Sequence, residues 1–386
     1  MTDAADPQIT SLTPEPTVVG TEGVSSPLKL LIATDAWDPQ TNGVVTTLKS
    51  LIGEMERQGH TIKVITPELF NTIATNYPDL SLAVPWGMSG LIESFQPNGI
   101  FIATEGPVGF ACRHFCVKHN LPFTSAYTTR WPEYFDTHLK FPPIPLGYQY
   151  LKWFHEPATG LMVSTRSLLK ELRRKGFKNL AQWTRGVDTD RFKPMALEQK
   201  QAFLPEHPRP FFVNIGRVSK EKNLQAFLEL DLPGTQIVVG PGPDLDELRE
   251  AYPKALFVGP KHGQALYDYY AGSDVFVFPS KSDTFGLVML EALASGIPVA
   301  AYNVTGPKDV IEAESAIGFL AEEQESLGAK VLEAWQAVQS GTVTAEDCRN
   351  YGLRYSWEQG VHQLLGRMKF IQWAGETPRP RMAEAP

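Results

Sequence analysis

Short apolar segments alternate with helical patterns along most of this chain, and that alternation limits the folds open to it. Residues 30–33 and 100–103 are apolar, residues 61–65 are predicted to form another strand, and residues 44–55 place valine, leucine, isoleucine and methionine at helical spacing. Residues 122–125 and 161–164 continue the series. Strands that are apolar throughout are typical of parallel sheets covered by helices on both faces. The sequence therefore predicts an α/β protein.

The alternation starts again near residue 210. This second series opens with a predicted strand at 210–216 and continues with strands at 236–239, 256–258, 275–278 and 299–301. A chain of 386 residues is longer than one hydrophobic core usually serves. We therefore expect two doubly wound domains, 27–195 and 196–356, with a ligand-binding cleft between the carboxyl ends of their strands.

The bulk properties exclude several classes of protein. A net charge of −8 argues against a nucleic-acid-binding surface. Three cysteines make no disulfide framework and suit a reducing cytosol. Residues 1–26 hold four acids and no Lys or Arg, which predicts a disordered tail rather than a signal peptide, and residues 376–386 are predicted to form a second tail. No apolar run of about 18 residues occurs, so we expect a cytoplasmic protein with at most peripheral membrane contact.

Two carboxylates flank a glycine-containing turn in residues 280–299. Gly286 permits close approach of the backbone to an anion, and the free amides of residues Phe285 to Leu287 precede a helix whose dipole favours negative charge. Glu291 lies two turns later, where it can reach the hydroxyls of a ribose, while Asp283 stands before the turn. These features predict a sugar diphosphate site. The alternative is an ordinary β-α unit whose apolar residues pack a sheet.

Three further loops carry candidate donor-binding residues. Arg217 and Lys222 follow Gly216 at the end of a strand and stand at the start of a helix. Cations are unfavourable at a helix N-terminus, so their position there suggests that an anion binds beside them. Their alternative role is exposed surface charge. Gly43 and Val44 enter the first helix and suit contact with a phosphate or sugar, although Asn-Gly is also a common turn. The loop at Gly240 lacks the third glycine of a dinucleotide fingerprint, which argues against a nicotinamide enzyme.

The segment 280–299, together with Arg217 and Lys222, resembles the nucleotide-sugar signature of the retaining glycosyltransferases of family 4. Asp283 stands where most members carry Glu. The resemblance covers about residues 28–373 and implies the GT-B fold, in which a last helix, here 357–375, crosses back to the first domain. It further implies glycosyl transfer from a nucleoside diphosphate sugar, with Gly240 lining the nucleotide pocket. We expect no cofactor and no required metal, since the two Asp-x-Asp triplets are assigned to turns.

Residues 125–134 resemble the bacterial and plant glycolipid synthases of this family, such as glycosyl-diacylglycerol and sulfoquinovosyl-diacylglycerol synthases. Thr128 stands where those proteins have an active-site His. The threonine hydroxyl can donate and accept a hydrogen bond but cannot shuttle a proton near neutral pH. The leaving phosphate is therefore expected to take the acceptor proton. Glu105, Arg130 and Glu133 are candidates to line the acceptor side, or to form structural ion pairs.

Basic residues are concentrated in residues 166–178, and aromatic residues lie just before them in the chain. The bases are Arg166, Lys170, Arg173, Arg174, Lys175 and Lys178, and the aromatic residues are Phe141, Tyr148, Tyr150, Trp153 and Phe154, interleaved with Lys140 and Lys152. Such a region suits docking on anionic lipid, although a solvated helix face explains it equally well. We expect transfer from a UDP-sugar to a lipid such as diacylglycerol. The alternatives are a GDP-mannose-dependent enzyme with a carbohydrate or polyprenyl-linked acceptor, and a weakly catalytic sugar-nucleotide-binding protein.

Overall fold

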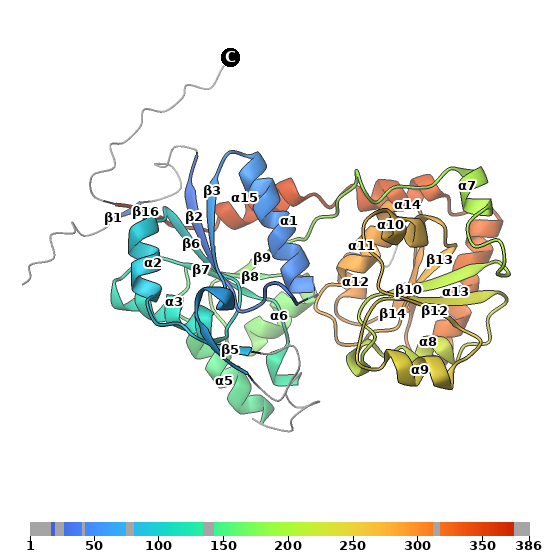
Figure 1. Ribbon diagram of the computed structural model, residues 1–386, viewed down its shortest axis with the longest axis horizontal. Helices are drawn as coiled ribbons and strands as arrows, with labels where there is room; N and C mark the ends of the chain where they lie inside the picture. Colours follow the sequence, from blue (N-terminus) through green and yellow to red (C-terminus); the bar gives the residue numbers. More distant parts are fainter. Residues whose placement is uncertain are drawn as a thin grey trace, which may run out of the picture.

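The protein consists of two parallel α/β domains, seen as two lobes in Figure 1. The computed structural model describes residues 17–19, 27–40, 43–74, 81–133, 143–311 and 317–373. Each domain contains a six-stranded sheet in which every neighbouring pair of strands is parallel. The predicted α/β class and the two doubly wound, Rossmann-like domains are confirmed.

The first sheet reverses its winding between β2 and β6. Its strand order is β3 (Thr61–Ile65), β2 (Lys29–Ala33), β6 (Gly99–Ile102), β7 (Thr124–Tyr127), β8 (Gly160–Val163) and β9 (Leu180–Gln182). Its helices are α1 (Gly43–Arg57), α2 (Met88–Phe95), α3 (Pro107–Lys118), α5 (Ile144–His155) and α6 (Arg166–Arg174). In open α/β sheets, ligands bind beside such a reversal, at the carboxyl ends of the strands.

The second sheet reverses between β10 and β13. Its order is β12 (Leu256–Gly259), β11 (Thr235–Val239), β10 (Phe211–Ile215), β13 (Val275–Phe278), β14 (Val299–Tyr302) and β15 (Gly318–Ala321). Its helices are α7 (Leu197–Gln201), α8 (Gln225–Leu228), α9 (Leu245–Ala251), α10 (Gln264–Ala271), α11 (Leu287–Ala294), α12 (Pro307–Val310), α13 (Gln324–Gln339) and α14 (Ala345–Gly352). The loops that follow β10 and β13 therefore lie next to each other.

The chain returns to the first domain through α15 (Trp357–Leu365), which lies on the first lobe beside α1 in Figure 1. Val361 and Leu364 are buried in the core of that domain, and the Trp183 indole donates to the carbonyl oxygen of Gly360 over 3.1 Å. The predicted crossing is confirmed. Its predicted extent as one helix over 357–375 is wrong, because the helix ends at Leu365 and the chain continues as a strand.

That strand, β16 (Phe370–Gln372), pairs antiparallel with β1 (Thr17–Val19). Three residues of the expected N-terminal tail are thus ordered against the end of the chain, because β16 offers them backbone hydrogen-bond partners while Phe370 and Ile371 anchor it in the core. The hairpin β4 (Asn71–Ala74) and β5 (Ser81–Val84), like β9 and β15, was missed in the sequence. Strands β4 and β9 include polar residues, Asn71, Thr72 and Gln182, so neither forms a continuous apolar run.

Candidate functional site

The site residues lie on loops at the two sheet reversals. The loops after β2 and β6 carry Gly43 and Glu105, and the loops after β10 and β13 carry Lys222 and Asp283. Parallel strands bring their carboxyl ends to one edge of a sheet, so loops distant in sequence become neighbours within each domain. This explains why candidates from separate motifs come together within each domain.

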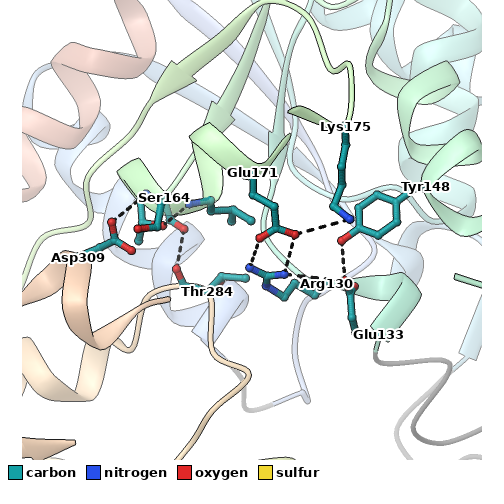
Figure 2. A network of polar contacts seen from close by, with 11 residues as sticks. Arg130, Glu133, Tyr148, Ser164, Glu171, Lys175, Thr284 and Asp309 are labelled. Atoms are coloured by element: carbon teal, nitrogen blue, oxygen red, sulfur yellow. Dashed lines mark hydrogen bonds and ion pairs between the residues drawn. The ribbon is translucent and has the colours of Figure 1, made fainter. Parts of the chain in front are cut away.

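Hydrogen bonds join the two domains directly at the loop that carries Thr284. The Thr284 hydroxyl donates to the carbonyl oxygen of Thr128 over 3.1 Å, and its own carbonyl oxygen accepts from the Ser164 hydroxyl over 3.1 Å. The Ser167 amide donates to Oδ1 of Asp309 over 2.8 Å, as Figure 2 shows beside the Thr284 contact. We call these three hydrogen bonds the interdomain junction. It places Thr128 next to the loop that carries Asp283.

Lys222 and Asp283 form an ion pair, although sequence analysis had treated them as separate candidates. Lys222 ends the 3-10 helix η3 (Lys220–Lys222), and its Nζ lies 2.7 Å from Oδ1 of Asp283. Both side chains are roughly a quarter exposed, at 27% and 22%. Arg217 is exposed on the same loop. A cationic loop therefore stands beside the start of α11.

Two buried oxygens at this place have no hydrogen-bond partner among the described residues. They are Oγ1 of Thr128, whose carbonyl oxygen accepts from Thr284, and Oδ2 of Asp283, the residue before Thr284. Buried polar atoms are nearly always hydrogen-bonded in folded proteins, and leaving one unpaired costs about 1–3 kcal/mol. The pair can be satisfied by a ligand that carries several hydroxyl groups.

Gly286 directs the chain into α11. Its φ of 89° lies in the left-handed region, which favours glycine because a side chain there would be strained. Phe285 is buried beside the ring of Tyr355, with the ring centres 6.5 Å apart. This packing holds the backbone amides of Leu287 and its neighbours at the helix N-terminus.

Glu291 lies on α11, where Oε2 accepts a hydrogen bond from the Tyr270 hydroxyl over 2.6 Å. Burial raises the pKa of Glu291 to about 7, and the hydrogen bond from Tyr270 partly opposes that rise. Burial, followed by the charge of Glu291, also raises the pKa of Tyr270. The carboxylate is therefore positioned and able to change its charge near neutral pH.

The glycines of the donor loops differ in what requires them. A Cβ on Gly240 would collide with the carbonyl oxygen of Gly216, so glycine at 240 lets the loops after β10 and β11 touch. Gly43 has open space at its Cβ position and opens α1, where its carbonyl oxygen accepts from the Thr47 hydroxyl over 2.7 Å. Val44 packs against the core of the first domain.

Asp35 is a residue of this edge that sequence analysis missed. Its carboxylate accepts from the amides of Val108 and Gly109, at 2.8 and 3.2 Å, and from the Thr104 hydroxyl at 2.8 Å. Burial raises its pKa against the effect of these bonds, and the charge of Glu105 adds to the rise. Its position directly after the first strand was the available signal. It caps α3 and fixes the loop that carries Glu105.

The acceptor-side candidates separate into two groups. Glu105 is buried, accepts from the Trp131 indole over 3.1 Å, and lies 3.2 Å from Nε2 of His155, whose Nδ1 lies 2.9 Å from the Ser125 hydroxyl. Arg130 instead makes two hydrogen bonds to Glu171, at 3.1 and 2.7 Å. Glu133 accepts from the Tyr148 hydroxyl over 2.6 Å and stands 3.8 Å from Arg130, in the network of Figure 2.

That network ties the loop after β7 to α5 and α6, so the ion-pair alternative for Arg130 and Glu133 matches the contacts found. Lys175 completes it, 3.8 Å from Glu171 and over the Tyr148 ring at 4.0 Å. These contacts hold the segment 128–133, which begins with Thr128, against α6. The charges of Arg130 and Glu133 are thus engaged by contacts within the first domain.

Some of the basic side chains of residues 166–178 form ion pairs with other described residues, and others do not. Lys178 pairs with Glu156 at 2.8 Å, whereas Arg166, Lys170, Arg173 and Arg174 are exposed. Tyr148 and Phe154 are buried, contrary to a role for them in lipid contact, and Lys140 and Phe141 lie outside the described residues. Exposed apolar side chains nearby are Phe110, Leu146, Tyr150 and Trp153, with ring centres 6.0 Å apart for Phe110 and Trp153. We call these four residues the α3–α5 surface.

Within the described ranges, no group of three or more His, Cys, Asp or Glu side chains is placed to hold a metal ion. Over the same ranges, no helix has both the length and the apolar content needed to cross a bilayer. Cys112 and Cys116 are buried in the core of the first domain.

Comparison with protein families matches both domains. Residues 196–340 match the family described as glycosyl transferases group 1, and residues 41–191 match glycosyltransferase family 4. A GDP-mannose-dependent alpha-mannosyltransferase of Mycobacterium tuberculosis is 27% identical, over 74% of this chain and 81% of that protein.

Two further relatives carry other names, one of which names a glycolipid product. The Streptococcus pneumoniae alpha-monoglucosyldiacylglycerol synthase is 25% identical, over 80% of this chain and 78% of its own. The Arabidopsis thaliana sulfoquinovosyl transferase is 31% identical over 62% of this chain, which spans only 50% of that protein. Among solved structures, sucrose-phosphate synthase from Thermosynechococcus elongatus superposes with a TM-score of 0.72 at 18% identity, covering 88% of this chain and 97% of its own. That likeness concerns the fold.

Proposed function

Because the chain belongs to glycosyltransferase family 4 and has the GT-B fold, we propose that it binds a nucleoside diphosphate hexose between its domains and transfers the sugar with retention. The observation that carries this proposal is the pair of unsatisfied oxygens, Thr128 Oγ1 and Asp283 Oδ2, beside the cationic loop of Lys222. The hydroxyl groups of the sugar would form hydrogen bonds with the two oxygens, and the diphosphate would bind the cationic loop.

The proposed roles follow from position and chemistry. Lys222 and Arg217, with the amides at the start of α11, stabilise the negative charge that grows on the leaving diphosphate. Asp283 accepts from the sugar hydroxyls, and Glu291 accepts from the ribose. The leaving phosphate takes the acceptor proton, because Thr128 has no group that titrates near neutral pH.

GDP-mannose is the donor that the curated relatives favour. Three GDP-mannose-dependent alpha-mannosyltransferases, at 24–27% identity, cover 74% of this chain. The UDP-sugar expected from the resemblance to glycolipid synthases becomes the second candidate, with weaker support. The two donors differ in base and sugar. The motifs are assigned to the diphosphate, the ribose and the sugar hydroxyls, which both donors contain.

A panel of sugar nucleotides tests the donor. GDP-mannose, GDP, UDP-glucose and UDP are each added to the folded protein, and the unfolding midpoint is measured. A ligand at about 100 times its dissociation constant adds about 2.7 kcal/mol to the free energy of unfolding. We expect GDP-mannose and GDP to raise the midpoint most. A response to UDP compounds alone would select the second candidate, and no response to any nucleotide would contradict the proposed function.

The acceptor that we propose is a hydroxyl of a membrane-bound lipid. Exposed bases on α6 and the aromatic side chains of the α3–α5 surface lie in the same domain as Glu105, and Tyr150 itself donates to the Glu105 carbonyl oxygen over 2.8 Å. Aromatic and basic groups together suit the interface of an anionic bilayer, at about 1 kcal/mol per base. Peripheral docking would bring a lipid acceptor to the first-domain side of the site. A soluble carbohydrate acceptor would not need this surface.

Reversing charge on α6 should therefore abolish vesicle binding. In Lys170→Glu/Arg173→Glu/Arg174→Glu, we expect no sedimentation with vesicles that contain phosphatidylglycerol, while the thermal response to the donor is kept. Binding by the wild type should weaken with salt, since the attraction acts over a Debye length of about 8 Å at physiological ionic strength. The matched control reverses three exposed bases of the connecting segment and the second domain, Lys193, Arg249 and Lys254. Equal vesicle binding by all three proteins would favour a soluble acceptor.

Thr128→Val is expected to have a small effect on turnover. The substitution keeps the shape and removes one neutral hydrogen bond to the sugar, which is worth about 1 kcal/mol or roughly a fivefold change in kcat/KM. No new pH dependence should appear between about pH 6 and 8, because no titratable group is lost. If Thr128→Val lost about three orders of magnitude in activity with donor affinity kept, the hydroxyl would take part in the chemistry.

A further inference from the structure

Arg185 is a buried cation for which the described residues provide no counterion. It follows β9 at the carboxyl edge of the first sheet, in the first segment that connects the domains, and only 5% of it is exposed. Its guanidinium lies 4.0 Å over the ring of Trp183. Its Nη1 has no hydrogen-bond partner among the described residues. Burial alone lowers its pKa to about 9, with no neighbouring charge to oppose the shift.

Arg113 shows that this arrangement is not imposed by stacking on tryptophan. Arg113 is also buried, at 7% exposure, and lies 3.9 Å over the ring of Trp153. It nevertheless donates to the carbonyl oxygens of Phe154 and Trp153, both over 2.8 Å. A guanidinium has five donors, and burying its charge without partners is strongly unfavourable. Arg185 therefore lacks what its counterpart has.

The surroundings of Arg185 connect it with the proposed donor site. Trp183, beneath it, belongs to the same apolar cluster as Trp37 and Val44 of the loop after β2. The amide of Val187 donates to the carbonyl oxygen of Tyr355 over 3.2 Å, and the Tyr355 ring packs against Phe285 in the donor loop. Packing thus links the segment around Arg185 to the core beside the loop of Gly43 and, through Tyr355, to the loop of Asp283.

We propose that Arg185 binds a phosphate-type oxyanion of the ligand held between the domains. It adds a cation from the first domain to Arg217 and Lys222, which both belong to the second. The site of the anion rests on the contacts of Arg185, whereas its source rests on the proposed function. The source is either the donor diphosphate or a phosphate carried by the acceptor.

The first test is the stability of the ligand-free protein. Arg185→Met keeps the volume and removes an unpaired buried charge, so its unfolding midpoint should equal or exceed that of the wild type. Arg113→Met is the matched control and should unfold at a lower temperature, because the carbonyl oxygens of Phe154 and Trp153 lose their donors. An equal loss of stability in both variants would show that the Arg185 guanidinium is satisfied within the protein, and the proposal would be wrong.

The second test is calorimetric titration with GDP, GMP, UDP, UMP and inorganic phosphate. If the donor supplies the anion, Arg185→Met should weaken the preferred nucleoside diphosphate about 10- to 100-fold, as expected for loss of a charged hydrogen bond, and its monophosphate much less. Arg185→Lys should recover part of that loss. If the acceptor supplies the anion, diphosphate binding is unchanged, and inorganic phosphate binds the diphosphate-saturated wild type but not Arg185→Met.

Unchanged binding of every probe in Arg185→Met would overturn the proposal and leave the proposed function intact. A wild type that binds no nucleoside diphosphate would contradict the proposed function instead. Inorganic phosphate still tests Arg185 in that case, because its loss in Arg185→Met supports the anion site and equal binding in both proteins rejects it.

Discussion

Lys222→Ala is expected to lower kcat by about 100- to 1,000-fold. Removing one preorganised donor to charge that develops in the transition state has an effect of that size. The measurement is release of nucleoside diphosphate from the donor that the nucleotide panel identifies. Lys220→Ala is the matched control, since Lys220 is an exposed lysine of the same 3-10 helix, and we expect it to keep full activity.

Folding should change little in Lys222→Ala. Its partly exposed pair with Asp283 at 2.7 Å contributes about 0–1 kcal/mol, as exposed ion pairs do. Equal losses of activity and of stability would mean that Lys222 acts through the fold. Unchanged kcat/KM in both Lys222→Ala and Arg217→Ala would remove the diphosphate from this loop.

Glu291→Ala is expected to weaken donor binding about 10- to 100-fold. A charged acceptor of hydrogen bonds contributes about 1.5–3 kcal/mol, and every 1.4 kcal/mol corresponds to a tenfold change in affinity. Isothermal titration with the nucleoside diphosphate measures the change, and the unfolding curve of the variant establishes that it is folded. Wild-type affinity in folded Glu291→Ala would exclude Glu291 from the donor site.

The same residue should make donor affinity depend on pH. With a pKa of about 7 in the folded protein, the Glu291 carboxylate is protonated at lower pH and then offers fewer acceptors to ribose hydroxyls. Affinity should therefore fall as pH decreases below about 7, and Glu291→Gln should remove that dependence. Tyr270→Phe should move the midpoint to higher pH, because the hydrogen bond from Tyr270 lowers the pKa.

The ligand-free protein should show the opposite trend in stability. The pKa of Glu291 is higher in the folded state than its ordinary value of 4.5, so the folded state binds the proton more tightly. This group's contribution is complete below about pH 4.5 and is lost as pH rises through 7. The free energy of unfolding should thus decrease over that range by more in the wild type than in Glu291→Gln.

The signals for the proposed donor half of the site are local. Residues 280–299 hold Asp283, Gly286 and Glu291 within a single strand, turn and helix, where backbone geometry alone relates them. Gly286 adopts a positive φ at the entry to α11. Residue type and short spacing are therefore sufficient to propose the chemistry of that segment.

The first-domain side depends on contacts between residues far apart in the chain. Thr284 meets Thr128 across 156 residues, and Arg130 meets Glu171 across 41. No local pattern distinguishes an arginine that binds an acceptor from one that pairs with a glutamate on another helix. The same reason hid the pair of Lys222 with Asp283, which are 61 residues apart.

By itself, the sequence determined the α/β class, two domains of parallel strands and the loops that carry the donor motifs, because apolar runs and glycine positions act through local backbone preferences. Only the tertiary structure decided which charges are paired, which polar atoms are left without partners, and where the chain ends pack. Arg185 illustrates the difference: as a residue type it is an ordinary surface cation, and burial without a counterion makes it a candidate binding residue. Desolvation and partner choice depend on the whole fold, so no segment of the sequence encodes them alone.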